Sequence, residues 1–183
     1  SDRLSRLLSE FLDFSRVRVT HSRPVDLGKI TRAAVEVVRN HPDCSKGCDI
    51  SLELQHVEVE GDEDLLHRVV VNLVLNAVQA SRGGRVHVAV RAAGPDDMPS
   101  GVQLERAVLL RVSDDGPGVP QELRERLFDP FVTGRSGGSG LGLAIVQRAV
   151  EAHRGVVFLD ETSGRGSSFT VLLPAAGARE VAA

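Results

Sequence analysis

The sequence of this 183-residue chain predicts an α/β fold, a two-layer sandwich in which helices cover one face of a mixed β-sheet and a further helix comes first. Segments with apolar residues three and four positions apart, typical of helices, are interspersed with segments in which apolar and polar residues alternate, typical of strands. The two strand-like segments nearest the C-terminus are close enough to form a hairpin, so the sheet is not expected to be purely parallel.

Residues 1–16 have the pattern of one amphipathic helix. Its stripe runs through Leu4, Leu7, Leu8, Phe11, Leu12 and Ser15. One helix cannot bury such a stripe by itself, so we expect it to pack against a partner helix. A charged connector, residues 16–23, follows, and Pro24 marks the start of the next unit.

Acidic residues mark the starts of the next two helices. Asp26 is expected to cap a helix that runs to about Asn40, and Asp62 to open a long helix that runs to about Ser81. Between these helices, residues 50–59 alternate as one short strand.

The remaining elements follow the same alternation. They are a strand at 85–92, a Pro- and Gly-rich loop at 94–101, a strand at 108–112, a short helix at 120–127, a loop at 129–139, a helix at 141–153, and strands at 156–160 and 168–173.

The composition argues against two classes of partner. A net charge of -3 offers no general polyanion-binding surface, and six Phe with no Trp or Tyr leave few rings for base stacking, so no nucleic acid is expected. No apolar run approaches the ~20 residues of a membrane span, and no cleavable signal opens the chain. The chain is therefore expected to be cytoplasmic and without direct membrane contact, whether or not its parent protein is anchored in a membrane.

The two cysteines, Cys44 and Cys48, lie in one polar turn. Together with His41 and His56 they make at most a makeshift zinc set that lacks the usual spacing. Free thiols in a reducing compartment are the expectation.

The long helix carries two asparagines, Asn72 and Asn76, which are four positions apart and therefore lie on one face. A buried amide must find partners for its donor and its acceptor, and an amide oxygen is a ligand that suits Mg²⁺. The pair therefore indicates a polar cleft with a metal. Two asparagines on a solvent-exposed strip are an equally valid interpretation of these residues alone.

A turn follows the strand at 108–112. Gly116 and Gly118 let the backbone turn tightly and a flat ligand approach, and the carboxylate of Asp114 can accept a hydrogen bond from an exocyclic amine such as that of adenine. An ordinary strand-to-helix turn would have the same composition.

A glycine-rich loop, residues 137–143, opens the next helix. The free N–H groups and the positive end of the helix dipole make an anion site, and the glycines leave room for phosphate oxygens. The loop matches neither the dinucleotide fingerprint nor the Lys-containing phosphate loop. A weaker glycine-rich turn, residues 164–170, leads into the last strand.

Together, these segments resemble the N, G1, G2 and G3 boxes of sensor histidine kinases, in the same order, with residues 127–131 as the F box. The resemblance extends over residues 24–174, and residues 7–16 are similar to the end of the second helix of the family's dimerisation domain. The family shares a superfamily with gyrase, the heat-shock ninety chaperones and the MutL proteins. This implies the Bergerat-type fold, in which ATP lies between the helices and a flexible lid. Gln79 in place of the common lysine, and the short lid, resemble the nitrogen-regulator-like branch.

The resemblance implies ATP and Mg²⁺ as cofactors. Asn76 would coordinate Mg²⁺, Asn72 would act at the phosphates, and Arg135 would supply charge from the lid, and these three form the catalytic set. Asp114 would read the adenine amine, with Thr170 supporting it from the neighbouring strand, and Phe128 and Phe131 would anchor the lid. The remaining predicted nucleotide contacts are Gln79, Ala80, Gly116, Gly118, Val119, Thr133, Gly138, Ser139, Gly140, Leu141, Gly142 and Leu143.

The same asparagine helix separates kinases from hydrolases. The hydrolases of the superfamily place a glutamate four residues before the metal-binding asparagine, where this chain has Asn72, and an amide cannot take a proton from water. The expected activity is therefore protein-histidine kinase. An ATP-hydrolysing conformational switch and a degenerate, non-catalytic nucleotide-binding module are the alternatives.

No histidine of this chain is followed by Asp or Glu, as the acceptor of the family is. The acceptor is expected on a dimerisation domain outside the chain, and a response-regulator receiver domain and a homodimeric parent protein complete the expected partners. The resulting division is 1–18 for the end of the second dimerisation helix, 19–24 for the connector, 25–175 for the ATP-binding catalytic domain and 176–183 for a disordered tail.

Overall fold

A computed structural model describes residues 2–44, 47–134, 138–160 and 165–178. The elements are α1 (Asp2–Ser15), β1 (Arg23–Asp26), α2 (Leu27–Arg39), β2 (Asp49–Leu54), β3 (Glu58–Gly61), α3 (Glu63–Ser81), β4 (Arg85–Ala92), the short 3-10 helix η1 (Pro95–Asp97), β5 (Ala107–Asp114), α4 (Gln121–Arg124), α5 (Gly142–Ala152), β6 (Val156–Leu159) and β7 (Ser167–Pro174).

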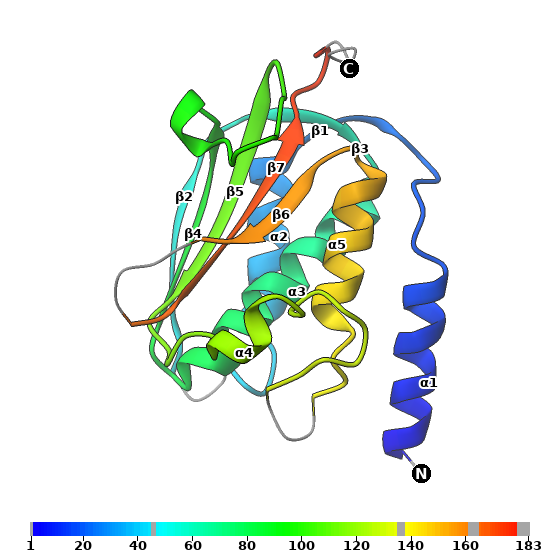
Figure 1. Cartoon of the computed structure of the whole chain (residues 1–183), viewed down its shortest axis with the longest axis vertical. Helices are drawn as coiled ribbons and strands as arrows, with labels where there is room; N and C mark the ends of the chain where they lie inside the picture. The colour runs from blue at the N-terminus through cyan, green and yellow to red at the C-terminus, as the bar shows by residue number, and fades with distance from the viewer. Residues whose placement is uncertain (1, 45–46, 135–137, 161–164, 179–183) are drawn as a thin grey trace.

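A five-stranded sheet in the order β2-β4-β5-β7-β6 forms one layer, and α2, α3 and α5 cover one face of it (Figure 1). β2 runs parallel to β4, while the other pairs are antiparallel, including the hairpin of β6 and β7. The predicted mixed sheet and two-layer sandwich are confirmed. The hydrophobic core lies between the two layers, where valine and leucine side chains of the strands meet the apolar faces of the helices.

Both predicted helix starts are confirmed by their caps. Asp26 accepts hydrogen bonds from the backbone N–H groups of Gly28 (2.9 Å) and Lys29 (3.3 Å) at the start of α2. Asp62 accepts one from Leu65 (3.2 Å) at the start of α3. These bonds satisfy N–H groups that have no partner within the helix.

The single strand predicted at residues 50–59 is wrong, because the structure divides it into β2 and β3. The chain leaves the main sheet after Gln55, whose N–H donates to the carbonyl of Val90, and Val57 then accepts from Leu27 at the start of α2. β3 pairs antiparallel with β1 in a separate two-stranded sheet. Alternation continues through both strands, so the local pattern cannot reveal that they belong to different sheets.

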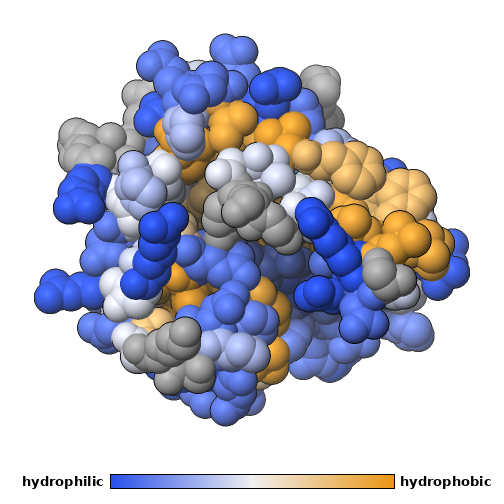
Figure 2. Space-filling model, turned by 90° about the horizontal axis from the view of Figure 1, so that it is seen from below, coloured by the Kyte–Doolittle hydropathy of each residue, from blue (hydrophilic) through white to orange (hydrophobic). Residues whose placement is uncertain are grey.

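The helix predicted at residues 1–16 is confirmed as α1, which lies beside α5 and outside the sandwich (Figure 1). Its stripe is largely exposed, with Leu4 at 67% and Leu8 at 57%. Arg148 of α5 holds the end of α1, donating to the carbonyl of Phe14 (3.0 Å) and lying 4.6 Å from the centre of its ring. Apolar residues therefore gather at the α1 side of the molecule (Figure 2), as expected of a helix that needs a partner.

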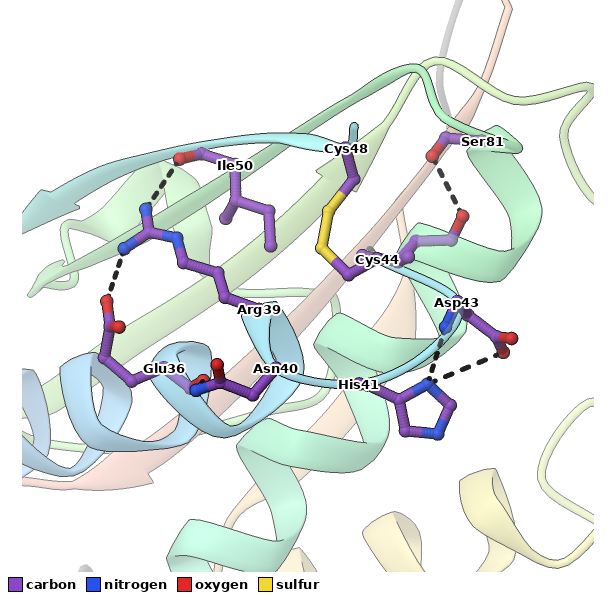
Figure 3. The surroundings of a disulfide bond; sticks show 10 residues. Glu36, Arg39, Asn40, His41, Asp43, Cys44, Cys48, Ile50 and Ser81 are labelled. Atoms are coloured by element: carbon purple, nitrogen blue, oxygen red, sulfur yellow. Dashed lines mark hydrogen bonds and ion pairs between the residues drawn. A yellow bond between two sulfur atoms is a disulfide. The ribbon is translucent and has the colours of Figure 1, made fainter. Parts of the chain in front are cut away.

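The expectation of free thiols is wrong, because Cys44 and Cys48 form a disulfide (Figure 3). Gly47, in the left-handed region at φ +96°, reverses the chain between them, and its N–H donates to the carbonyl of Cys44 (3.2 Å). Within the described ranges, no three His, Cys, Asp or Glu side chains are placed to hold a metal ion, so the makeshift zinc set does not form there. Nor does any helix of the described chain have the length and apolar character needed to cross a membrane.

A charged network covers the face of the sheet opposite the helices. Asp97 of η1 binds Arg91 through two hydrogen bonds (2.8 and 2.9 Å), and Arg111 lies 3.8 Å from the same carboxylate. The hydrogen bonds from Arg91, which outweigh the effect of burial, lower the pKa of Asp97 from 3.8 to about 2. The charged form of Asp97 therefore stabilises the folded state.

We predict that Asp97→Asn lowers the free energy of unfolding at pH 7 by about 1–2 kcal/mol. Because the folded-state pKa is depressed, this stabilisation is present above the unfolded-state value of 3.8 and is lost as the pH falls toward about 2. Urea unfolding of parent and variant between pH 7 and pH 2 measures the difference. A difference that stays constant over the whole range would contradict the assignment to ionised Asp97.

Candidate functional site

The two asparagines of α3 lie on its partly buried face, beside residues that enter the core. Leu73, Val74 and Ala77 are buried, whereas Asn72 and Asn76 are intermediate in exposure. A Cβ placed on Gly142 would lie 3.4 Å from Oδ1 of Asn72. Asn72 therefore faces the start of α5 rather than bulk solvent, so the polar-cleft interpretation fits better than an exposed strip.

The start of α5 presents backbone N–H groups next to Asn72. Leu141, the residue before the helix, is fully buried, and its side chain makes no capping hydrogen bond. The hydroxyl of Ser139 accepts a hydrogen bond from the N–H of Leu141 (3.3 Å). The N–H groups at a helix N-terminus favour anions, so the anion site predicted at the glycine-rich loop would lie beside Asn72.

The F box (residues 127–131) and the glycine-rich loop (residues 137–143) are in contact through the backbones of Phe131 and Gly140. The N–H of Phe131 donates to the carbonyl of Gly140 (3.0 Å). Gly140 has φ +73°, and a Cβ on it would come within 2.5 Å of the Phe131 backbone. No other residue type fits this position without displacing the segment that leads into the lid.

The two phenylalanines predicted to anchor the lid contact different elements. Phe128 packs edge-on against Phe169 of β7, with 6.1 Å between ring centres. Phe131 is 60% exposed and stacks on Phe11 of α1, with 6.4 Å between ring centres. Phe128 therefore ties the segment to the sheet, and Phe131 reaches the N-terminal helix.

The turn after β5 packs directly against the end of α3. Asp114 accepts a hydrogen bond from the N–H of Gly116 (2.9 Å), and a Cβ on Gly116 would lie 2.6 Å from the carbonyl oxygen of Ala80. Gly118 adopts φ +83°. The fold thus brings together the predicted adenine reader, Asp114, and the predicted contact Ala80, which are far apart in the sequence.

Thr170 does not support Asp114. It pairs with Arg111, and its hydroxyl donates to Asp160 (2.6 Å) and accepts from Arg111 (3.0 Å) on the face opposite the helices. Side chains alternate along a strand, so Thr170 and Ser167, three positions apart, point to opposite faces.

Ser167 is the residue that pairs with Asp114, and it is 7% exposed. Directly opposed residues of an antiparallel pair share a face, so Ser167 lies beside Asp114 on the helix side. Ser167 was not among the predicted site residues. It directly follows Gly166, a glycine of the turn into the last strand, which could have indicated it. The backbone of Gly166 approaches the carbonyl of Asp114 so closely that a Cβ would overlap it.

The remaining predicted site residues divide into several groups. Val119 and Leu143 are partly buried against the core. Gln79 donates to Asp43 (2.9 Å), and both line an open cavity of about 410 Å³ at the end of α3. Thr133 and Gly138 are exposed. Arg135 lies outside the described residues.

Comparison with known proteins identifies the family. Residues 61–177 match the family of histidine kinase-, DNA gyrase B- and HSP90-like ATPases. The chain is 33% identical over 180 residues to the sensor histidine kinase ZraS of Klebsiella oxytoca, covering 97% of this chain and 37% of that protein. It is 31% identical over 189 residues to the sensory histidine kinase/phosphatase NtrB of Rhodobacter capsulatus, covering 95% of this chain and 50% of that protein.

Solved structures share the fold. The mycobacterial sensor histidine kinase MprB superposes with a TM-score of 0.68 at 29% identity, covering 85% of this chain and 98% of that one. Full-length ShkA in complex with AMPPNP gives a TM-score of 0.73 at 30% identity, covering 99% of this chain and 37% of that one.

The chain spans only 37% of ZraS and 50% of NtrB. The matched family segment contains α3, the turn after β5, α5 and β7, which carry most of the predicted site residues. The chain therefore belongs to the histidine kinase-, DNA gyrase B- and HSP90-like ATPase family, within which it resembles the ATP-binding catalytic domains of sensor histidine kinases.

Proposed function

We propose that this chain binds ATP with Mg²⁺ and transfers the γ-phosphoryl group to a histidine on the dimerisation domain of its own kinase, for relay to an aspartate of a response-regulator receiver domain. One observation carries the proposal: Asn72, the residue four positions before Asn76, lies against the start of α5 at Gly142. The phosphates would bind between Asn72 and the start of α5, where Asn72 supplies an amide and not a general base.

The adenine end of the site would lie where β5 meets the end of α3. The carboxylate of Asp114 accepts from the purine amine, Ser167 lies on the same face, and Gly116 and Gly118 let the flat ring approach the backbone. Ala80, near the end of α3, would contact the ring from the helix side. The charge of Asp114 selects a donor group on the ligand, which favours adenine over a purine that presents a carbonyl there.

The phosphate end would lie between α3 and the start of α5. The backbone N–H groups that open α5 bind phosphate oxygens, and the amide of Asn72 donates to them. Asn76, partly buried on the same face, has a neutral oxygen of the kind that Mg²⁺ accepts alongside waters and phosphates. When bound, Mg²⁺ would neutralise charge on the phosphates. Arg135 would add positive charge from the lid.

The chemistry follows from what the site lacks at Asn72. A carboxylate there could take a proton from a water molecule as that water attacks the γ-phosphate. An amide cannot accept the proton and can only orient neighbouring groups. Transfer then depends on positioning and charge stabilisation, and the acceptor must come from another domain. We assign residues 1–18 to the end of the second dimerisation helix, 19–24 to the connector and 25–175 to the catalytic domain of a cytoplasmic, homodimeric kinase region.

The test mixes this chain with a separately made dimerisation domain that carries the acceptor histidine, together with Mg²⁺ and ATP labelled at the γ-phosphate. We expect acid-labile label on the histidine of that domain and none on this chain. A dimerisation domain with the acceptor histidine changed to Gln is the control and should stay unlabelled. Release of inorganic phosphate at the same rate with and without acceptor would instead identify a hydrolase.

A further inference from the structure

A buried carboxylate, Asp62, joins segments that lie far apart in the sequence. Its Oδ1 accepts from the N–H of Leu65 and caps α3. Its Oδ2 accepts from the N–H of Thr20 (3.0 Å), the hydroxyl of Thr20 (3.0 Å) and the N–H of His21 (3.3 Å). Asp62 is only 6% exposed. The connector that leads out of α1 is thus bound to the residue that begins α3.

The backbone of Asp62 makes a further connection, to the end of α5. Its N–H donates to Nε2 of His153 (3.0 Å), while Nδ1 of His153 lies 2.7 Å from the carbonyl oxygen of Ala149. Because Nε2 accepts, the ring proton is on Nδ1 and is donated to Ala149. A Cβ on Gly61 would come within 2.8 Å of the ring, so glycine is what lets the imidazole approach.

Both helices tied at this point carry residues of the proposed phosphate site, Asn72 in the middle of α3 and Gly142 at the start of α5. Asn72 lies ten residues along α3 from Asp62, about 15 Å away, and Gly142 lies eleven residues before His153, about 16 Å away. Asn72 and Gly142 face each other across the phosphate end of the site. Buried residues of α3 and α5 share one close-packed core, and such a core transmits strain, so the separation of the two helices at Asp62 affects the spacing of Asn72 and Gly142.

The number of donors on Asp62 exceeds what a helix cap requires. Capping α3 uses one oxygen and one N–H group, as it does at any helix start. The other oxygen receives three donors, all from the connector. Burial by itself would raise the pKa of Asp62, but the hydrogen bonds from Thr20, Leu65 and His21 lower it to about 2. The carboxylate is therefore charged, and charge-assisted hydrogen bonds are the stronger kind.

We propose that Asp62 is a positioning residue, through which the connector at Thr20 and His21 sets the spacing of α3 and α5 at the nucleotide site. The inference rests on the proposed function, since it concerns the affinity of that site. Coupling between two sites is reciprocal, so a bound nucleotide must in turn strengthen the attachment of the connector to Asp62.

Hydrogen exchange and calorimetry on the whole chain test this coupling, with ADP and Mg²⁺ as the probe. We expect ADP to slow exchange at the amides of Thr20 and His21 by about threefold or more. Asp62→Ser keeps a hydroxyl that caps α3 but cannot reach the connector. It should bind ADP about 3- to 10-fold more weakly and lose the slowing of exchange.

Thr20 supplies a matched pair of variants that leave the cap of α3 untouched. Thr20→Val removes one donor to Asp62 without changing the shape of the side chain, and it should weaken ADP binding about two- to threefold. Thr20→Ser retains the hydroxyl and should restore the parent affinity. This pair carries the test if Asp62→Ser fails to fold.

The outcomes distinguish the positioning role of Asp62 from the proposed function. If the parent chain binds ADP, but ADP leaves exchange at Thr20 and His21 unchanged and Thr20→Val binds like the parent, the positioning role is overturned and the proposed function stands. If the parent chain itself binds no ADP, both fall together.

Discussion

Asp114→Asn is expected to weaken binding of ADP and ATP by about 30- to 100-fold, which corresponds to about 2–3 kcal/mol. The carboxylate can accept a hydrogen bond from the purine amine while its Oδ1 is held by the N–H of Gly116. An asparagine that keeps its oxygen on Gly116 turns its own NH₂ group toward that amine, so two donors face each other. Calorimetric titration of parent and variant in the presence of Mg²⁺ measures the loss.

The neighbouring carboxylate offers a matched control. Asp115 is exposed and accepts from the N–H of Arg85 (2.9 Å), away from the proposed purine position. Asp115→Asn makes the same chemical change one residue along, and we expect it to retain the parent affinity. If Asp114→Asn and the parent gave the same binding isotherm, the assignment of the adenine end would be wrong.

Asn76→Ala is expected to abolish the contribution of Mg²⁺ to ATP affinity. In the parent, Mg²⁺ should tighten ATP binding by at least about tenfold, because an amide oxygen and the phosphates share the ion. The variant loses the amide oxygen that is the proposed protein ligand of the ion. Titrations with Mg²⁺ and with a chelator, on parent and variant, give the difference directly.

Asn40→Ala is the control for this experiment. Asn40 ends α2, where its amide donates to the carbonyl of Glu36 (2.9 Å), and it is not among the predicted nucleotide contacts. Its replacement costs a helix-end hydrogen bond but should leave the Mg²⁺ effect intact. The metal assignment fails if Asn76→Ala keeps the full Mg²⁺ effect, or if Asn40→Ala loses it as well.

Much of the site could be predicted because its parts are encoded locally. The four-residue spacing of Asn72 and Asn76 predicts that they share a helix face. The glycines after β5 and before α5 predict that a ligand can approach the backbone closely. The structure adds that these segments meet, through Gly142 against Asn72 and Gly116 against Ala80. Each motif alone also has an ordinary structural explanation. The prediction that together they bind a nucleotide therefore depended on the family resemblance.

Two of the corrected predictions concern strand pairing. Thr170 was placed beside Asp114, but strand register puts Ser167 there and turns Thr170 toward Arg111. Residues 50–59 were joined into one strand, although they pair with two different sheets. The register of β5 and β7, and the choice of partner strand for β2 and β3, are set by pairing between distant segments, which the local pattern of side chains does not record.

The sequence by itself determined the helix starts at Asp26 and Asp62, the glycine-rich turns and the pairing of amides on α3, because these depend on side chains and backbone within a few residues. Only the tertiary structure decided that Ser167 faces Asp114, that Phe131 meets Phe11, and that Thr20 is bound to Asp62. These contacts join residues 40 or more positions apart, and no local preference records which distant partner the packed chain will bring to them.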